Sequence, residues 1–271
     1  MVARPTIVVT GACGNLGGKL VTALAHRYSI RCLDRKPAKD VLVADLSRYE
    51  KSWVSLFEGA DTVLHFAAEP LPTSSWAQVQ RGNIIATGNV LRASREHGIR
   101  RVVFASTNQI MAGYRFSDAL VTTTMPPAPL NPYAVSKLFC EEAGRAFAAE
   151  TGIPFIALRI GNILPGENIP HAEMGIGTWG QQMWLSNRDF ADGVQAAIDA
   201  PDVSFAVLNL VSNNPGMRWD LSHTRQILGF EPKDGFTAIA SPAVVAEDEA
   251  ARVARLVPGQ WLDQSFRPLR G

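Results

Sequence analysis

The sequence has few of the features that mark disulfide-rich, metal-binding and membrane proteins. Its 271 residues include only three cysteines, which form no CxxC pair and no cluster with histidine. Three cysteines are too few for a disulfide framework, and no metal site is expected. The apolar runs are too short for a signal peptide or a membrane helix. We therefore expect a protein of a reducing compartment, the cytoplasm, without a membrane partner.

An excess of either charge is also missing. Lysine and arginine total 26 against 25 aspartates and glutamates, so the net charge is +1. A nucleic-acid-binding protein usually has a basic excess or patch, so no nucleic acid partner is expected. The chain does have 46% hydrophobic residues and a length that can bury a full core. This composition is typical of a globular enzyme.

Short apolar runs alternate with longer amphipathic segments in the first part of the chain. The predicted strands are Thr6–Thr10, Ile30–Asp34, Val41–Ala44, Thr62–Phe66, Arg101–Ala105 and Phe155–Arg159. The predicted helices between them are Asn15–Tyr28, Arg48–Phe57, Val79–His97 and Pro132–Thr151. Such alternation is typical of βαβ units, which need helices on both faces of a parallel sheet. The predicted fold class is α/β, a Rossmann-like doubly wound parallel sheet.

The pattern changes after about Gly161. A stretch rich in glycine and proline, up to Gly180, is predicted to be loop. The segments predicted after it are a helix Asn187–Ala200, a strand Ala206–Val211, a helix Trp219–Leu228 and a helix within Ile239–Val257. We therefore expect a dinucleotide-binding domain over residues 1–161. Residues 162–271 are expected to form a small α/β substrate-binding region, interleaved with that domain and not independent of it.

A glycine-rich loop follows the first predicted strand. Gly11, Gly14 and Gly17 have the spacing GxxGxxG, with Asn15 and Leu16 between them, and a helix follows. Such a loop lets backbone amides approach a pyrophosphate, and the helix N-terminus favours its negative charge. A glycine turn that only joins a strand to a helix is the alternative. We interpret the loop as a nucleotide site because further residues agree with it.

The ends of the next two strands carry acidic residues. Asp34 ends the second strand, where a carboxylate accepts hydrogen bonds from ribose hydroxyls and repels a 2′-phosphate, which favours NAD. Arg35 follows directly and is able to serve a 2′-phosphate in part. Asp45 and Leu46 are placed for the adenine edge, although a cap before Ser47 is an equally good interpretation of Asp45.

The fourth strand ends beside the place where a dinucleotide must pass. Phe66, Ala67 and Ala68 stand there, and the two small alanines leave room for a cofactor. The segment is therefore predicted to line the cofactor site. His65, just before it, is interpreted as a packed strand histidine and not as a catalytic base.

Tyr133 and Lys137 form the second strong motif. Residues four apart lie on the same face of a helix. A lysine beside a phenol favours the phenolate and lowers a pKa that starts at about 10. The tyrosine then becomes a proton acceptor near neutral pH. Together with the glycine-rich loop, the pair predicts a hydride-transfer enzyme.

With these residues in hand, the sequence resembles the extended short-chain dehydrogenase/reductase superfamily over nearly its whole length. The matching segments are Thr10–Gly17, Asp45–Leu46, His65–Ala68, Gly82–Ile84, Phe104–Asn108, Tyr133–Lys137 and Arg159–Asn162. Within the superfamily, the short C-terminal region and the segment Met183–Asp189 look most like the uronate dehydrogenase and sugar C1 dehydrogenase branch. The resemblance adds Asn83, Ile160 and Asn162 to the expected cofactor-binding residues.

The resemblance implies oxidation of an anomeric hydroxyl to a lactone. NAD+ takes the hydride, and Tyr133 removes the hydroxyl proton. Lys137 holds the nicotinamide ribose and lowers the pKa of Tyr133. Ser106 and Thr107 point to opposite faces of a strand, and Thr107 is the one that orients the substrate oxygen. The expected catalytic residues are thus Thr107, Tyr133 and Lys137.

The resemblance also defines a substrate site. Its expected residues are Thr107, Asn108, Gln109, Asn162, Trp179 and Arg188. Uronate dehydrogenases hold the sugar carboxylate with an arginine in the segment that corresponds to Trp179 and its neighbours, where this sequence has no basic residue. Arg188 is the nearest cation, but pairing with Asp189 or Asp192 is an equally good interpretation. A neutral sugar is therefore predicted to react at least comparably to its uronate, and Trp179 either stacks on it or packs in the core.

Two other functions remain open. A nucleotide-sugar epimerase or dehydratase of the same superfamily recycles its NAD, but it needs a larger C-terminal region than residues 162–271. A non-catalytic NAD-sensing protein needs no proton-handling residues, which the set around Tyr133 argues against. Net NADH release with a free sugar distinguishes the dehydrogenase from both. The superfamily also implies a homodimer in which the helices Val79–His97 and Pro132–Thr151 pack across a two-fold axis.

Overall fold

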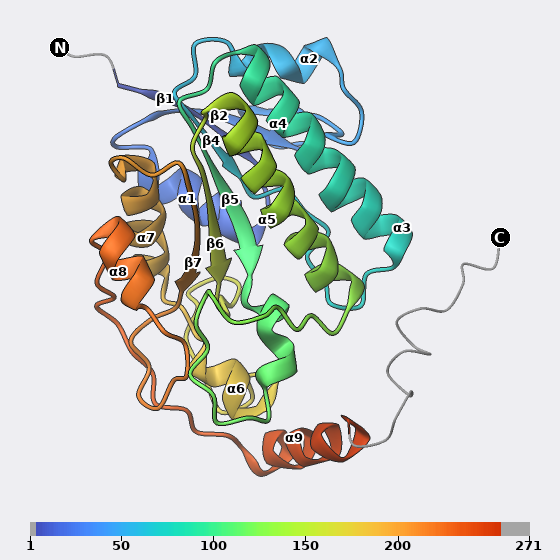
Figure 1. The fold of residues 1–271 in the computed structure, drawn as a ribbon, viewed down its shortest axis with the longest axis vertical. Coiled ribbons are helices and arrows are strands. Elements are labelled where there is room, and N and C mark those ends of the chain that lie inside the picture. The colour runs from blue at the N-terminus through green and yellow to red at the C-terminus, as the bar shows by residue number, and fades with distance from the viewer. Residues whose placement is uncertain (1–3, 256–271) are drawn as a thin grey trace.

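A seven-stranded sheet forms the centre of the fold (Figure 1). The computed structural model describes residues 4–255. The strands are β1 (Thr6–Thr10), β2 (Ser29–Asp34), β3 (Val41–Val43), β4 (Thr62–His65), β5 (Arg101–Thr107), β6 (Phe155–Ile160) and β7 (Phe205–Leu210). All neighbours are parallel, in the order β3-β2-β1-β4-β5-β6-β7. The order in which strands are added to the sheet thus reverses between β1 and β4, which is the switch point where doubly wound sheets bind ligands.

Helices cover both faces of this sheet. The helices of the described residues are α1 (Asn15–Leu24), α2 (Lys51–Val54), α3 (Trp76–Val79), α4 (Ala86–Glu96), α5 (Pro132–Thr151), α6 (Gly177–Gln182), α7 (Asn187–Asp199), α8 (Ser222–Leu228) and α9 (Pro242–Arg255). Three irregular helical segments are η1 (Ser55–Phe57), η2 (Gln80–Ile85) and η3 (Asn108–Tyr114). Within residues 4–255, no helix has the length and apolar character needed to cross a membrane.

Two apolar clusters attach the helices to the two faces. Along β5, Val103 packs in one cluster with Leu20 of α1 and Phe190 of α7. The next residue, Phe104, packs in the other cluster with Val90 of α4. Figure 1 accordingly shows α1 and α7 on one side of the sheet and α4 and α5 on the other. Strands buried on both faces explain the apolar runs that predicted them, and the predicted α/β fold class is confirmed.

Helix α5 lies very close to the sheet. A Cβ at Gly144 would overlap with the ring of Phe155 on β6, so glycine alone fits at this crossing. The helix begins after Asn131, whose side chain caps it. Its first two turns therefore carry Tyr133 and Lys137 to the carboxyl end of β5, where the lysine contacts the strand backbone.

The differences from the predicted elements have local causes. The helix predicted at Val79–His97 starts at Trp76, because Ser75 and Gln78 form a capping box before it. The glycine-rich stretch predicted to be loop contains α6. A Cβ on Gly180 would overlap with a backbone carbonyl of the preceding turn, so this glycine permits close packing rather than flexibility.

The C-terminal part shares the sheet with the N-terminal part. β7 pairs with β6, so the sheet extends across the boundary predicted at residue 161. Helix α9 lies within the predicted helix Ile239–Val257, of which residues 256 and 257 are outside the described range. In Figure 1, α6 and α9 lie beyond the carboxyl ends of the strands. These two helices contribute to a cap over the edge where ligands are expected.

Candidate active site

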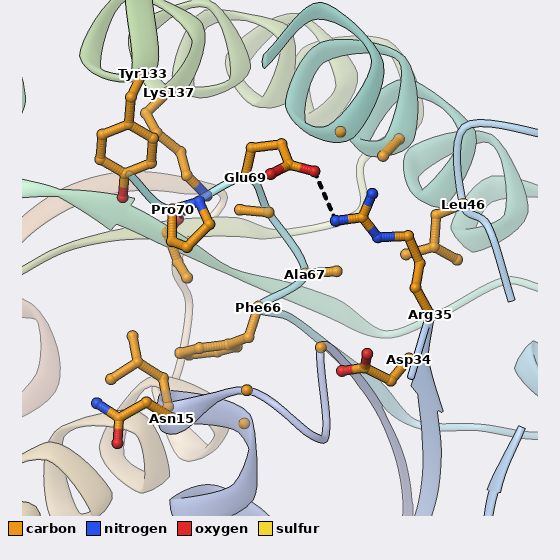
Figure 2. Close-up of a pocket in the computed structure, with 18 of the residues that line it drawn as sticks. Asn15, Asp34, Arg35, Leu46, Phe66, Ala67, Glu69, Pro70, Tyr133 and Lys137 are labelled. Atoms are coloured by element: carbon orange, nitrogen blue, oxygen red, sulfur yellow. Dashed lines mark hydrogen bonds and ion pairs between the residues drawn. The ribbon is translucent and has the colours of Figure 1, made fainter. Parts of the chain in front are cut away.

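A cavity of about 590 Å³ opens at the carboxyl ends of the strands (Figure 2). The predicted cofactor-binding residues that line it are Gly11, Gly14, Asn15, Leu16, Gly17, Asp34, Asp45, Leu46, Phe66, Ala67, Ala68, Tyr133, Lys137 and Asn162. Figure 2 shows Tyr133 and Lys137 on one side of it and Asp34 with Arg35 on the other. We call these the catalytic end and the ribose end. The two ends suit an elongated ligand such as a dinucleotide.

The glycine-rich loop forms the floor between the two ends. Gly11 has a φ of 74°, and a Cβ there would lie 2.6 Å from the backbone nitrogen of Ala67. At Gly17, a Cβ would overlap with the carbonyl oxygen of Gly11. Gly14 immediately precedes the ten-residue helix α1, whose first residues line the cavity. Backbone amides and a helix dipole at this place fit a pyrophosphate.

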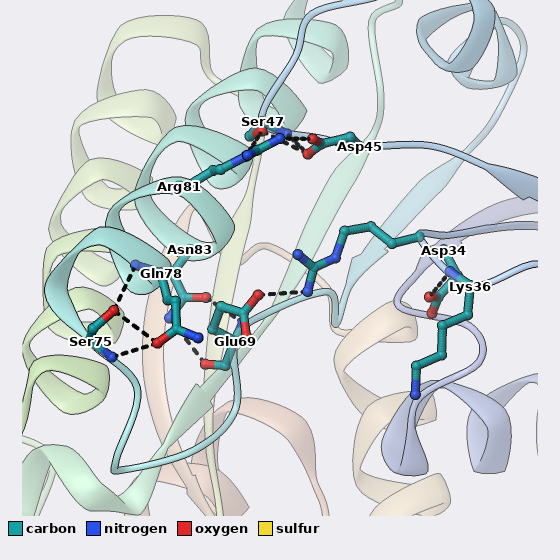
Figure 3. A network of polar contacts seen from close by, with 10 residues as sticks. Asp34, Lys36, Asp45, Ser47, Glu69, Ser75, Gln78, Arg81 and Asn83 are labelled. Atoms are coloured by element: carbon teal, nitrogen blue, oxygen red, sulfur yellow. Dashed lines mark hydrogen bonds and ion pairs between the residues drawn. The ribbon is translucent and has the colours of Figure 1, made fainter.

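The ribose end contains charges of both signs (Figure 3). Asp34 is held by backbone amides, because its Oδ2 accepts from Cys13 N (2.9 Å) and its Oδ1 from Lys36 N (2.8 Å). Arg35 instead pairs with Glu69, with 2.6 Å between Nη2 and Oε1. The fixed carboxylate fits recognition of ribose hydroxyls. Glu69 is a residue of this site that the sequence did not predict.

Asp45 has local partners as well as a place on the cavity wall. It accepts hydrogen bonds from the backbone nitrogen (3.1 Å) and hydroxyl (2.7 Å) of Ser47 and forms an ion pair with Arg81. Burial raises the pKa of Asp45, but the bonds from Ser47 and Arg81 outweigh it and bring the pKa to about 2. The carboxylate thus stabilises a turn, because the following helix begins only at Lys51.

Lys137 is a buried charged residue at the catalytic end. Its side chain is 2% exposed, and its Nζ donates to the carbonyl oxygen of Ala105 (2.7 Å) above the ring of Phe104. Burial lowers the pKa of Lys137 to about 8. His65 is also buried, hydrogen-bonded between Thr10 and Thr87, and burial followed by the charge of Lys137 lowers its pKa to about 3. His65 is therefore a neutral packed histidine.

The hydroxyl of Thr107 lies beside the phenol of Tyr133. Burial raises the pKa of the Tyr133 phenol, and the nearby Thr107 hydroxyl offsets only part of this. The expectation that Lys137 lowers the pKa of Tyr133 is wrong for this structure. The reason is geometric, because the ammonium group of Lys137 is directed to the backbone of β5.

A buried ion pair lies beneath the catalytic end. Glu141, one turn after Lys137, accepts hydrogen bonds of 3.0 and 2.8 Å from the guanidinium of Arg159 on β6. The two side chains are 1% and 3% exposed. Ser106 donates to the same carboxylate (2.5 Å). The Ser106 hydroxyl is therefore used by Glu141, and Thr107 is the hydroxyl at the end of β5 that lies beside the Tyr133 phenol.

Several predicted site residues do not line this cavity. They are Asn83, Thr107, Asn108, Gln109, Ile160, Trp179 and Arg188. Ile160 packs in the apolar cluster beside α7. Asn83 is buried, accepts from Glu69 N (2.7 Å) and donates to Ser136 Oγ (2.8 Å). Asn83 and Ile160 therefore lie behind the cavity wall.

Asn108 and Gln109 begin η3 directly after Thr107. Gln109 N donates to Thr107 Oγ1 (3.2 Å). Asn108 is 1% exposed, and neither polar atom of its side chain has a hydrogen-bond partner within residues 4–255. Buried amides are nearly always paired, so this one has unused capacity for a polar ligand beside the Thr107–Tyr133 pair.

Trp179 and Arg188 are engaged with other side chains of the protein. Trp179 is 4% exposed, and its ring centre lies 4.9 Å from that of Trp219. Of the two roles considered for Trp179, the structure therefore agrees with packing in the core. Arg188 forms an ion pair with Asp234. The sequence suggested acidic partners on the same helix, whereas Asp234 lies 46 positions further on.

A cation that the sequence did not predict lies over Trp179. The guanidinium carbon of Arg218 is 4.6 Å from the centre of its ring. Arg218 lines a second cavity of about 260 Å³ together with Arg115, which pairs with Asp248 (2.7 Å). No basic residue lies near Trp179 in the sequence, but the folded structure places Arg218 beside it, so the expectation that Trp179 has no basic neighbour was wrong. Only the fold brings Arg218 to this place.

The fold and the site together define the class of this protein, a dinucleotide-dependent oxidoreductase. The chain belongs to the NAD dependent epimerase/dehydratase family, which it matches over residues 7–175. Its cofactor is NAD, and the glycine-rich loop and Asp34 fit that ligand.

The chain is also similar to individual sugar dehydrogenases. L-arabinose 1-dehydrogenase (NAD(P)(+)) of Haloferax volcanii is 34% identical over 251 residues, which are 86% of this chain and 98% of that protein. Uronate dehydrogenase of Pseudomonas putida is 29% identical and is matched over 89% of this chain and 91% of its own. The solved uronate dehydrogenase of Agrobacterium tumefaciens has a TM-score of 0.74 at 26% identity, covering 95% of this chain and 91% of that chain. The predicted superfamily and branch are confirmed.

Proposed function

We propose that this protein oxidises the anomeric hydroxyl of a sugar or uronate to the corresponding lactone. The observation that carries the proposal is that Tyr133 and Lys137 line the end of the cavity together, with the hydroxyl of Thr107 beside the phenol. NAD+ supplies the hydride acceptor when it is bound. The similar sugar and uronate dehydrogenases support the same reaction class, because the chain covers more than nine tenths of their length.

Each catalytic residue has a distinct part in this reaction. Thr107 orients the substrate hydroxyl, and Tyr133 removes its proton at the phenol oxygen. Burial favours the neutral phenol, so the phenolate needs stabilisation, which the nearby Thr107 hydroxyl supplies in part. Lys137 lies on the same helix face with its ammonium group directed to the carbonyl oxygen of Ala105, and a pKa of about 8 leaves most of it protonated at neutral pH, so its proposed part is to hold the nicotinamide ribose.

Asn108 is the substrate-binding residue that the structure supports best. Its amide is buried, adjoins Thr107 and has no partner in the described part of the chain. An amide supplies both donors and an acceptor, which suits a vicinal pair of sugar hydroxyls. Replacement of Asn108 by alanine is therefore expected to raise KM for the sugar more than it lowers kcat.

We further propose that a neutral sugar reacts at least comparably to its uronate. Arg35 and Arg81, which line the cavity, are paired with acidic residues at the ribose end. Arg188 is paired with Asp234. Arg218 is a further candidate for a carboxylate anchor, and it belongs to the second cavity.

A substrate panel tests both statements. Galacturonate, glucuronate, galactose, glucose, L-arabinose and glucose 6-phosphate are assayed for NADH formation with wild type, Arg188→Ala and Arg218→Gln. Comparable rates for neutral sugars and uronates are expected, with no change in the variants. A strong uronate preference that disappears in one variant would overturn the neutral-sugar statement and identify the anchor. Conversion of a nucleotide sugar without net NADH would favour the epimerase instead.

A cytoplasmic homodimer completes the proposal. α4 and α5 pack beside each other on one face of the sheet, and Phe139 on α5 and Ile85 before α4 are 54% and 43% exposed. Exposed apolar groups of this size support a face that a second copy covers. The three cysteines are free, as expected in a reducing compartment. Light scattering on wild type and Phe139→Glu tests the dimer, which the substitution is expected to dissociate.

A further inference from the structure

The ribose end contains a cation that an acidic residue holds in place. Arg35 extends from the end of β2, and Glu69 comes from the loop after β4, so their ion pair joins the two sides of the switch point (Figure 2). The arginine side chain is 58% exposed, whereas the glutamate is 19% exposed. Glu69 is thus the anchored partner, and Arg35 is the one with room to move.

Glu69 is anchored through its own backbone and its neighbours. Its backbone nitrogen donates to Asn83 Oδ1 (2.7 Å; Figure 3). Asn83 in turn donates to Ser136 Oγ (2.8 Å) on α5. A Cβ at Gly82 would lie 2.7 Å from Glu69 Cγ, so a glycine at this position leaves room for the Glu69 side chain. Gly82 and Asn83, which the sequence analysis singled out, therefore help to position Glu69.

Asp34 by itself does not settle the choice between the two nicotinamide dinucleotides. Its charge repels a 2′-phosphate, but Arg35 and Lys36 follow it directly and line the same cavity. A guanidinium next to the ribose is able to bind a phosphate through two parallel hydrogen bonds. The position of the Arg35 guanidinium therefore matters as much as the presence of Asp34.

We propose that Glu69 is a specificity-determining residue for the cofactor, which acts by holding the Arg35 guanidinium away from a 2′-phosphate. With Arg35 neutralised, the charge of Asp34 and Glu69 disfavours NADP+, and NAD+ is selected. The proposal deepens the cofactor choice of the site described above and does not depend on which sugar is oxidised.

The experiment measures binding without any sugar, so it stays valid whatever the substrate is. Titration calorimetry gives Kd for NAD+ and NADP+, and for the fragments 5′-AMP and adenosine 2′,5′-bisphosphate, with wild type, Glu69→Gln, Arg35→Met and the double variant. Glu69→Gln is expected to strengthen binding of both 2′-phosphorylated ligands roughly tenfold, the effect of one charge-assisted hydrogen bond. Binding of NAD+ is expected to change little, which also shows that each variant is folded.

The double variant distinguishes a released arginine from a removed negative charge. If Glu69 acts through Arg35, Arg35→Met abolishes the gain that Glu69→Gln produces. If the gain persists in the double variant, simple charge repulsion by Glu69 explains it and the proposal is overturned.

Asp45→Asn is the matched control, because it removes one negative charge from the same end and releases Arg81 instead. A gain equal to that of Glu69→Gln would also overturn the proposal, as would no gain in Glu69→Gln itself.

Discussion

The two ends of the cavity hold their charges in opposite ways. At the ribose end, the side chains of Arg35 and Arg81 are 58% and 57% exposed, and each is paired with a carboxylate. At the catalytic end, Lys137 is 2% exposed and donates to a backbone carbonyl. Exposed pairs contribute little to stability and rearrange easily, whereas buried charges shift pKa values and are costly to disturb. Substitutions should therefore change ligand choice at one end, and rate or stability at the other.

The largest effect is expected from Tyr133→Phe. The variant loses the proton acceptor, so kcat should fall by roughly 10²- to 10⁴-fold while NAD+ binding is nearly unchanged. Steady-state NADH formation and calorimetric NAD+ binding measure the two quantities. Tyr114→Phe is the control, because it removes a hydroxyl that only bonds to the Pro126 carbonyl. Turnover near that of wild type would remove Tyr133 from the mechanism.

The buried ion pair beneath the catalytic end should give the next largest effect. Glu141→Gln leaves Arg159 buried without a countercharge, which typically costs about 3–5 kcal/mol of unfolding free energy. Glu96→Gln breaks the exposed pair with Arg92 and should lower the unfolding free energy far less. Urea denaturation of both variants makes the comparison. Equal losses would show that burial does not distinguish the two pairs.

His65 should make the protein sensitive to acid. Its pKa is about 3 in the folded protein, against about 6.5 in an unfolded chain. Between these values the unfolded chain binds a proton that the folded protein does not, so stability falls as the pH drops through this window. The loss from pH 7 to pH 5 should be about 2 kcal/mol. His65→Gln lowers stability at pH 7 but should flatten this dependence, which urea midpoints at both pH values reveal.

The smallest effect is expected at the ribose end. Asp34→Ala removes the carboxylate that disfavours a 2′-phosphate, so the ratio of kcat/KM with NAD+ to that with NADP+ should fall about tenfold, a change near 1.4 kcal/mol. A wild type that uses both cofactors equally would contradict the interpretation of Asp34.

The sequence predicts the sheet and the glycine-rich loop well because both leave local patterns. Buried parallel strands are apolar along their whole length, and each strand predicted from such a run is present. The glycine spacing of the loop and the four-residue spacing of Tyr133 and Lys137 are both visible within a few residues of sequence. Elements whose signals are local were therefore placed correctly to within a few residues.

The remaining features depend on contacts between distant segments. Arg188 meets Asp234, and Arg218 meets Trp179, because the chain folds back on itself. Nothing in the spacing of these residues indicates either contact. The pKa of Tyr133 is another case, since burial and the direction of a neighbouring ammonium group decide it. A sequence pattern gives which groups are present, but not how deeply they are enclosed.

The missing side chain at Gly144 has a consequence for the chemistry. That glycine sets the clearance between α5 and β6, and α5 carries Tyr133 while the neighbouring strand β5 carries Thr107. Even one methyl group there would displace the helix by on the order of 1 Å, given the usual spacing of carbon atoms in contact. A hydrogen bond tolerates only a few tenths of an ångström. Gly144 touches neither cofactor nor sugar, yet it helps to fix the distance between Tyr133 and Thr107.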